Sequence, residues 1–257
     1  MAGLLQGGVL PVILEIYCAL ILLGPILLRS KFRLKAKLNP QLVPLESLPP
    51  DVQSFMTLRA GAITKLGFEP VGTIAISMVN NAGSFMALYS NPRTSEWADV
   101  SVVKSAKQFK GYIEFITRCS DDSQVDTNSS STAPVLSPTP SYHVFRFPQV
   151  ADASVLYQAH RKLVQQNLRG AARPEIPAKG QELAELKRRL ERYGVRQQKQ
   201  GYMALDASGE YYRLTWKGAV LGAWRSIWPV SILRNYWMQG QSQTRLRSLG
   251  VGQYRSA

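Results

Sequence analysis

The sequence predicts an α+β protein with an N-terminal transmembrane helix, an antiparallel sheet flanked by helices, and a C-terminal helix–hairpin–helix module. Three observations predict this class: an apolar run near the N-terminus, short β-rich segments separated by turn residues, and helical periodicity before and after those segments. The predicted parts are an anchor with a basic flank (1–37), a linker (38–50), an α+β domain (51–169), a second linker (170–180), the helix–hairpin–helix module (181–238) and a flexible basic tail (239–257).

The predicted membrane helix begins at Val9 and ends at Leu28. About twenty residues at a rise of about 1.5 Å per residue span about 30 Å, which is the thickness of the hydrocarbon core. Glu15 is the only charge in the run, and its cost of roughly 2.5–3.5 kcal/mol is smaller than the summed gain from the Leu, Ile and Val residues around it. Glu15 is either a partner contact within the membrane or a tolerated acid near the helix end. A cleaved signal peptide is disfavoured because no basic segment precedes the run.

A basic flank follows the apolar run. No Lys or Arg precedes the run, whereas positions 29–37 hold five basic residues and no acid. Because positive charge is retained on the cytoplasmic side, the flank predicts a single-pass membrane protein with its N-terminus outside and its soluble domain in the cytoplasm. The same charges would attract anionic lipid. The predicted lipid-facing residues are Arg29, Lys31, Arg33, Lys35 and Lys37.

The α+β domain is predicted from a change in periodicity along the chain. A helix should begin at Pro50 and end at Gly67, which suits a C-terminal cap. Residues 120–141 are rich in Ser, Thr, Pro and Asp and are predicted to form a solvated loop. Helical periodicity returns at residues 152–168, where His160 is expected to be a hydrogen-bonded surface or boundary residue. Strands of an antiparallel sheet are expected at residues 71–78, 84–89, 97–103, 112–117 and 142–147.

The C-terminal module combines a basic helix, a hairpin and a tryptophan-rich helix. The basic helix is predicted at residues 181–198, the hairpin turn at 206–209 and the second helix at 216–228. Tryptophans mixed with Lys and Arg are typical of a membrane interface or of docking against the anchor, although the same rings would also suit the core of the domain. The predicted interfacial or partner-binding residues are Trp216, Lys217, Trp224, Arg225, Trp228, Arg234 and Trp237.

Part of this module resembles the wing and following helix of winged-helix DNA-binding proteins. The likeness rests on Tyr211-Tyr-Arg-Leu-Thr-Trp-Lys-Gly-Ala219, because a Leu-Thr-x-Lys-Gly step often closes that wing. It covers about forty residues and implies a membrane-tethered DNA-binding protein as an alternative function. A Pro-rich linker stands where the preceding helix-turn of such a module would be expected.

As a whole, the chain resembles uncharacterised bacterial proteins with one N-terminal transmembrane helix and a cytoplasmic α+β domain. The likeness is carried by Phe115-Ile-Thr-x-x-Ser-Asp-Asp-x-x-Val-Asp-Thr-Asn128, by His160 after the strand end Phe145-Arg-Phe-Pro148, and by Tyr212-Arg-Leu-Thr-Trp-Lys-Gly-Ala219. It covers most of the chain and implies an architecture but no mechanism.

Charge and motifs favour binding over catalysis. A formal net charge of +14 suits anionic lipid, nucleic acid or an acidic protein partner. The sequence contains no glycine-rich phosphate loop, nucleophile elbow or zinc-protease motif, so no catalytic or cofactor-binding residues are predicted. Two histidines are too few to predict a metal site, and two cysteines predict no disulfide framework.

The function expected from the sequence is therefore that of a membrane-anchored cytoplasmic interaction or scaffold protein. Its expected partners are the membrane, anionic lipid and a membrane or membrane-associated protein. DNA binding is the first alternative and a cryptic enzyme the second. The sequence gives no indication of an oligomeric state.

Overall fold

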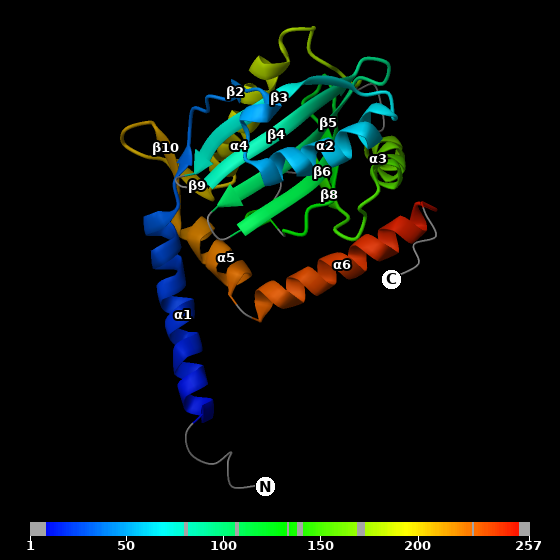
Figure 1. Ribbon diagram of the computed structural model, residues 1–257. Helices are drawn as coiled ribbons and strands as arrows, with labels where there is room; N and C mark the ends of the chain where they lie inside the picture. Colours follow the sequence, from blue (N-terminus) through cyan, green and yellow to red (C-terminus); the bar gives the residue numbers. More distant parts are fainter. Residues whose placement is uncertain are drawn as a thin grey trace.

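The computed structural model describes residues 9–79, 82–105, 108–132, 134–137, 141–168, 173–227 and 229–251. These residues form a mixed α+β fold with two sheets and six α-helices, so the predicted α+β class is confirmed. Figure 1 shows a large sheet between helices, a small sheet at one end, and α1 projecting away from both.

The large sheet has seven strands in the order β2-β3-β4-β5-β6-β7-β8. All neighbouring pairs are antiparallel except β7 and β8, which are parallel. The predicted antiparallel sheet is therefore correct except at this edge. The strands are β2 (Gln41–Leu42), β3 (Glu69–Val79), β4 (Ala82–Asn91), β5 (Glu96–Ser105), β6 (Gln108–Arg118), β7 (Gln124–Asn128) and β8 (Tyr142–Arg146).

Strand β7 corrects the prediction of a solvated loop at residues 120–141. All five residues of β7 are buried, because each is paired with β6 on one side and β8 on the other. Because β7 is polar, the sequence did not indicate a strand inside the sheet. Its side chains form hydrogen bonds within the protein. Ser120–Ser123 form a connection as predicted, whereas Leu136, in the described part of the segment after β7, is also buried.

Helices α2 (Pro50–Thr64) and α3 (Ala153–Asn167) cover one face of the large sheet and form the main core with it (Figure 1). Proline occupies the first turn of α2, and the Asp152 carboxylate caps α3 by accepting from the backbone N–H of Ser154 and Val155. A short 3₁₀ turn, η1 (Leu45–Ser47), precedes α2. Gly67 has a φ of +87°, which fits its predicted role after the helix.

His160 lies inside this core, which corrects its expected place at the surface or boundary. Its side chain is fully buried, with Nε2 2.9 Å from Thr117 Oγ1 and Nδ1 3.0 Å from Thr127 Oγ1. Burial lowers the pKa of His160 to about 4, so the neutral ring is retained at pH 7. Both hydroxyls come from the sheet, and the histidine therefore ties α3 to β6 and β7.

Helix α4 (Glu182–Lys199) covers the opposite face of the sheet (Figure 1). The predicted leucine stripe faces inward, and Leu186 is fully buried against Ile74, Leu88 and other apolar side chains of the sheet. The Glu191 carboxylate accepts a 2.9 Å hydrogen bond from the backbone N–H of Leu38. The basic helix of the C-terminal module thus packs on the same sheet as α2 and α3, on its other side.

The small sheet has the strand order β1-β10-β9, formed by β1 (Leu34–Lys35), β10 (Tyr211–Leu214) and β9 (Met203–Leu205). Strands β9 and β10 confirm the predicted hairpin, and Gly209 in its turn has a φ of +72°. Strand β1 was not predicted, because a two-residue strand inside a basic flank has no periodicity to detect. It joins the segment that follows α1 to the C-terminal module.

Helices α1 (Val9–Lys31) and α5 (Trp216–Ser226) pack side by side (Figure 1). Small residues of α5 allow the close approach, since a Cβ on Gly24 of α1 would lie 3.4 Å from the Ala223 Cβ. Within the part of the chain that the structure describes, no helix is both long enough and apolar enough to cross a membrane.

Helix α6 (Val230–Ser248) occupies much of the segment predicted as a flexible tail. The expectation of a loose segment from residue 239 onward fails as far as Ser248, because the C-terminal part of α6 docks on the domain. Leu246, Leu249 and Val251 are buried in the main core. Three apolar residues spread over six positions are too few to show a helical period in the sequence.

Candidate functional site

A row of polar side chains crosses the sheet face beneath α4. In the strand register Asp99 on β5 lies opposite Glu114 on β6, Glu114 lies opposite Asn128 on β7, and Asn128 lies opposite Arg146 on β8. Like charges placed directly opposite each other on a sheet are destabilising. Two adjacent carboxylates on a covered face are therefore a cost that packing alone does not explain.

Burial and mutual repulsion alter the ionisation of these carboxyl groups. Asp99 is fully buried, and burial followed by the charge of Glu114 raises its pKa to about 8. Asp126, also fully buried, has its pKa raised to about 7 by the same two causes in the same order. The pKa of Tyr142, whose hydroxyl donates to Asp126 Oδ2, is also raised by burial. Buried acids with pKa values near neutrality mark a candidate functional site.

Arg189 of α4 lies over these acids. Its guanidinium is 3.8 Å from Asp99 Oδ2 and its side chain is only 14% exposed. Two hydrogen bonds reach the carboxyl groups from neighbouring side chains: Ser101 Oγ donates to Asp99 Oδ1 (2.6 Å) and Asn128 Nδ2 donates to Glu114 Oε1 (2.7 Å). One guanidinium thus lies over Asp99 and Asp126, both of which are partly protonated at pH 7.

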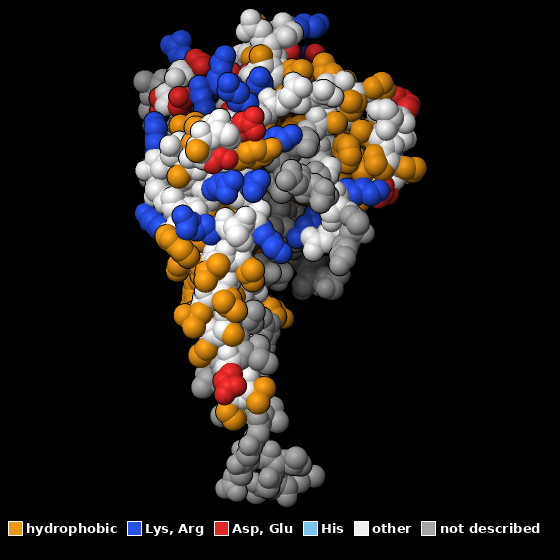
Figure 2. All heavy atoms as spheres, turned by 90° about the vertical axis from the view of Figure 1, so that its left-hand side faces the viewer, with side chains coloured by type: hydrophobic (Ala, Val, Ile, Leu, Met, Phe, Trp, Pro, Cys, Tyr) orange, Lys and Arg blue, Asp and Glu red, His pale blue; other side chains and the backbone are white. Residues whose placement is uncertain are grey.

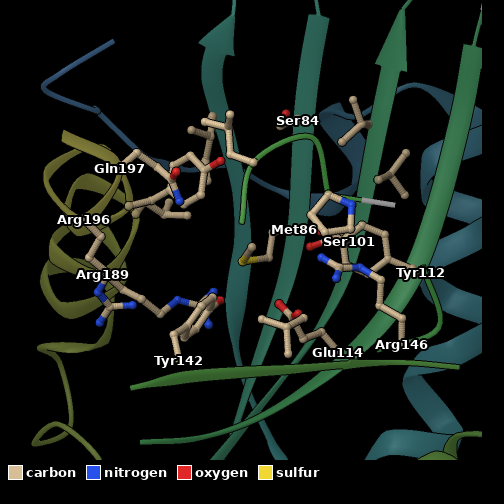
Figure 3. Close-up of a pocket in the computed structure, with 18 of the residues that line it drawn as sticks. Ser84, Met86, Ser101, Tyr112, Glu114, Tyr142, Arg146, Arg189, Arg196 and Gln197 are labelled. Carbon is tan, nitrogen blue, oxygen red and sulfur yellow. The ribbon is translucent and has the colours of Figure 1, made fainter. Parts of the chain in front are cut away.

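An open cavity of about 310 Å³ lies between α4 and this face of the sheet; we call it the α4 cavity. Figure 3 shows Arg189, Arg196 and Gln197 reaching it from α4, while Tyr112, Glu114 and Arg146 lie on the strands. Its walls are mostly apolar, and the short segment 134–137 closes one side. The apolar walls are formed mainly by Ile76, Phe85, Met86, Val102, Val103, Leu136, Val144 and Leu190.

The sequence analysis missed this site. Trp97, Asp99 and Ser101 alternate with Ala98, Val100 and Val102 on β5, and polar residues at alternate positions usually indicate a solvent-exposed face. Only the covering helix α4, far away in the sequence, makes that face a buried one. The pairing of Asp99 with Glu114 depends on the strand register, which the sequence does not reveal.

The predicted membrane-spanning residues lie on α1. The side chain of Val9 is outside the described residues, Glu15 is exposed, and Leu28 is half-buried against the small sheet. Of the predicted basic flank, Arg29, Lys31, Arg33 and Lys37 are exposed and Lys35 is half-buried in β1, which pairs with β10.

The predicted tryptophans are on the surface wherever the structure describes them. Trp216, Trp224 and Trp237 are 53%, 51% and 67% exposed, and Trp228 lies outside the described residues. Half or more of each described ring is thus available to solvent, lipid or a partner. The alternative in which these three rings close the core does not agree with such exposure.

The basic residues predicted beside the tryptophans donate hydrogen bonds to backbone carbonyls and to one side-chain hydroxyl of the protein. Lys217 Nζ donates to Gln200 O (2.9 Å), and the Arg225 guanidinium donates to Val135 O and to Ser137 Oγ (both 3.1 Å). Arg234 Nη2 donates to Pro134 O (2.8 Å). Arg225 and Arg234 therefore fasten α5 and α6 to the segment that forms one wall of the α4 cavity.

The structure brings the predicted α1 and α5 residues together on one side of the molecule. The Arg29 guanidinium lies 4.6 Å from the centre of the Trp216 ring, a cation–π contact between α1 and α5. Figure 2 shows a column of hydrophobic side chains along α1 with Lys and Arg side chains gathered where the column meets the domain.

Comparisons of the chain with protein-family models, with curated proteins and with solved structures found no match. Among the described residues, no group of three or more His, Cys, Asp or Glu side chains is placed to hold a metal ion. The two features that bear on function are therefore the α4 cavity and the exposed side of α1 and α5.

Proposed function

We propose that the protein is a membrane-anchored binding protein whose α+β domain is held at the cytoplasmic surface of a membrane. In this proposal α1 is the anchor, and α5 with the first half of α6 lies against the bilayer. The domain then faces the cytoplasm, where it is available to a protein partner at the same membrane. The observation that carries the proposal is an exposed apolar surface shared by three helices.

This surface is too extensive for an ordinary water-exposed face. Leu22 of α1 is 70% exposed, and Leu233 and Tyr236 of α6 are 63% and 69% exposed. Large contiguous apolar patches on a protein surface indicate contact with a membrane or another protein. The exposed apolar residues of the three helices are Val12, Ile21, Leu22, Leu23, Ile26 and Leu27 of α1, Trp216, Val220 and Trp224 of α5, and Ile232, Leu233, Tyr236 and Trp237 of α6.

The charge distribution supports the choice of a lipid surface. Exposed Arg29, Lys31 and Arg33 follow the apolar part of α1, at the level where lipid headgroups would lie if α1 entered a bilayer. Trp216 beside Arg29 combines an aromatic ring and a cation at that level, as is common at membrane interfaces. Each basic residue near an anionic leaflet contributes about 1 kcal/mol.

Helix α6 would lie along the membrane surface. Its first half carries the exposed Ile232, Leu233 and Trp237, whereas Ser242 in its second half exchanges hydrogen bonds with the Gln149 side chain (2.7 and 3.0 Å). A helix that is apolar toward one side and fixed to the domain at its other end can rest in the headgroup region.

Quenching of tryptophan fluorescence by brominated lipid tests this arrangement. The full chain is used. A truncation that removes α1 and its basic flank would also remove β1, in which Leu34 is buried. Single-tryptophan variants, with the other four rings replaced by Phe, are reconstituted into phosphatidylcholine vesicles whose acyl chains carry bromine. Trp224 and Trp237 should be quenched, because their rings would contact acyl chains.

Trp97 is the matched control. It is 7% exposed and packs between the sheet and α4, so the variant that keeps only Trp97 should show little quenching. If Trp224 and Trp237 are quenched no more than Trp97, helices α5 and α6 do not contact the bilayer and the proposal is wrong.

A further inference from the structure

Two arginines on the walls of the α4 cavity have no carboxylate partner. Among the described residues, no Asp or Glu oxygen lies within 4.0 Å of the Arg146 or Arg196 guanidinium, in contrast to Arg189. Arg146 Nε is buried without a hydrogen-bond partner in the described part of the chain, and so is Arg189 Nη1. A buried donor without an acceptor costs about 1–3 kcal/mol.

A third unmatched group lies on the same cavity. Gln197 is 2% exposed, and its Nε2 donates to Ser137 O (3.1 Å), while its Oε1 accepts no hydrogen bond from the described residues. The cavity therefore combines two free donors from arginines and one free acceptor with walls that are otherwise apolar. Orphaned polar atoms in an apolar cavity indicate where the polar end of a ligand would sit.

We propose that the α4 cavity binds a small anionic amphiphile, with its carboxylate or phosphate head on Arg146 and its apolar chain along α4 and the strands. Guanidinium groups bind such heads through charge-assisted hydrogen bonds. Three arginines and one carboxylate, that of Glu114, line the cavity, so an anion is favoured over a cation. The volume of about 310 Å³ is at the lower end of the range for small-ligand pockets.

The carboxyl groups next to the cavity do not reverse this choice. Asp99 and Asp126 lie below Arg189, and the positive charge of Arg189 acts to lower the pKa of both. Asp126 also accepts from Gln124 and from Tyr142. Arg189 thus offsets the acids of the sheet, while Arg146 at the β8 end of the polar row stays available to a ligand.

The position of the cavity offers two sources for such a molecule. Pro134, Leu136 and Ser137 line the cavity, and the same segment accepts hydrogen bonds from Arg225 of α5 and Arg234 of α6. An amphiphile could therefore arrive from a bilayer beside these helices or from water. Binding itself does not depend on the proposed membrane contact, and the two can be tested separately.

Photo-crosslinking tests the binding site directly. The full chain is reconstituted in phosphatidylcholine nanodiscs and exposed to decanoic acid that carries a diazirine on its chain. Peptide mapping should locate the label on cavity residues such as Met86, Val103 and Tyr193. Decanoate should compete with the label, whereas decylamine and decanol, which have the same chain, should compete at least about ten-fold less well. Equal competition by decanol would overturn the proposal.

Two variants separate the head contact from the chain contact. Arg146→Gln should weaken labelling about ten-fold, and Arg146→Lys should restore part of it. Val103→Trp, at a 39% exposed position on the cavity wall, should place its ring in the cavity and abolish labelling. Lys187→Gln, on the exposed side of α4, is the control and should label like the wild type, and all variants should unfold at the wild-type temperature.

A second arm identifies the source. The diazirine chain is supplied either as free acid from water or as an acyl chain of phosphatidylglycerol built into the nanodisc. Labelling of the cavity in either arm supports the proposed anionic amphiphile, and the arm that labels identifies its origin. Failure in both arms would contradict it, whatever the quenching of Trp224 and Trp237 shows about membrane contact.

Discussion

At the scale of single residues, the main feature is a pair of buried aspartates whose pKa values are raised to near neutrality. Asp99 and Asp126 have pKa values raised by burial, and then by Glu114, to about 8 and about 7. In the unfolded chain an aspartate has a pKa near 3.9. Folding therefore takes up protons at neutral pH, and stability falls as pH rises until both acids are ionised in the folded protein.

The replacement Asp99→Asn tests this linkage. The unfolding temperature of the wild type in a nonionic detergent should decrease between about pH 7 and pH 8.5, because the unfolded state binds fewer protons there. In the variant the decrease should be smaller. His160, with its pKa lowered to about 4, is neutral in the folded protein and nearly so in the unfolded chain over this range, so it does not contribute appreciably.

Asp121→Asn is the matched control for Asp99→Asn. Asp121 is exposed, and its pKa is lowered mainly by the hydrogen bond from the Ser123 hydroxyl. It is ionised in both states above about pH 6, so its removal should leave the pH dependence unchanged. A wild-type protein with a flat profile over the same range would show that Asp99 is ionised in the fold.

At the scale of elements, α6 combines two different roles in one helix. Leu246 is 4% exposed and belongs to the main core, whereas Leu233, thirteen residues earlier, is 63% exposed. The same residue type in the same helix thus meets the protein interior at one end and solvent or lipid at the other. The Arg245 guanidinium, 4.7 Å from the centre of the Phe145 ring, adds a contact at the buried end.

The pair Leu246→Ala and Leu233→Ala separates these roles. Leu246→Ala should lower the free energy of unfolding by about 2–5 kcal/mol, because it leaves a cavity in the core. Leu233→Ala should leave the free energy of unfolding in detergent within about 0.5 kcal/mol of the wild type. Chemical denaturation followed by circular dichroism measures both. Equal losses would mean that the first half of α6 is also packed against the domain.

Elements with strong local signals were predictable from the sequence, whereas those that depend on distant partners were not. Helix α2 has proline in its first turn and Gly67 after its end, and hairpin β9–β10 has a clear turn, so both were predicted. Strand β7 is polar because its side chains bond within the sheet. Strand β1 exists only because β10 pairs with it.

At the scale of the whole molecule, the C-terminal part of the chain packs against the N-terminal part. The segment after α1 pairs with β10, α5 packs on α1, and Leu249 and Val251 enter the main core. The two sheets, α1 and the C-terminal helices are thereby interlocked. The sequence predicted these parts in a linear order, but their mutual packing depends on contacts between residues about two hundred positions apart, which periodicity does not reveal.

The α4 cavity also belongs to this scale, because three distant parts of the chain form it. The strands supply Glu114 and Arg146, α4 supplies Arg189, and segment 134–137 closes one side. Segment 134–137 also receives hydrogen bonds from Arg225 and Arg234, so it lies between the cavity and the surface proposed to face the bilayer. The arginines predicted to be interfacial lie on α5 and α6, where their hydrogen-bond partners are backbone carbonyls and the Ser137 hydroxyl.

The proposed membrane contact also predicts an orientation for the whole chain. The exposed Arg29, Lys31 and Arg33 follow the apolar part of α1, whereas residues 1–8 contain no Lys or Arg. Since basic flanks are retained on the cytoplasmic side, an enzyme reporter that is active only in the cytoplasm should be active when fused after Ala257. A reporter that is active only outside the cytoplasm should be inactive at the same position.

Replacing Arg29, Lys31 and Arg33 with Gln should weaken this preference and give a mixed population, because three of the five basic residues that follow the apolar part of α1 are then removed. Replacing exposed Lys187, Arg188 and Lys199 of α4, far along the chain, is the matched control and should leave orientation unchanged. A wild-type fusion active only outside the cytoplasm would reverse the proposed topology. A fusion active in the cytoplasm but released from membranes by alkaline carbonate would instead show that α1 does not anchor the protein.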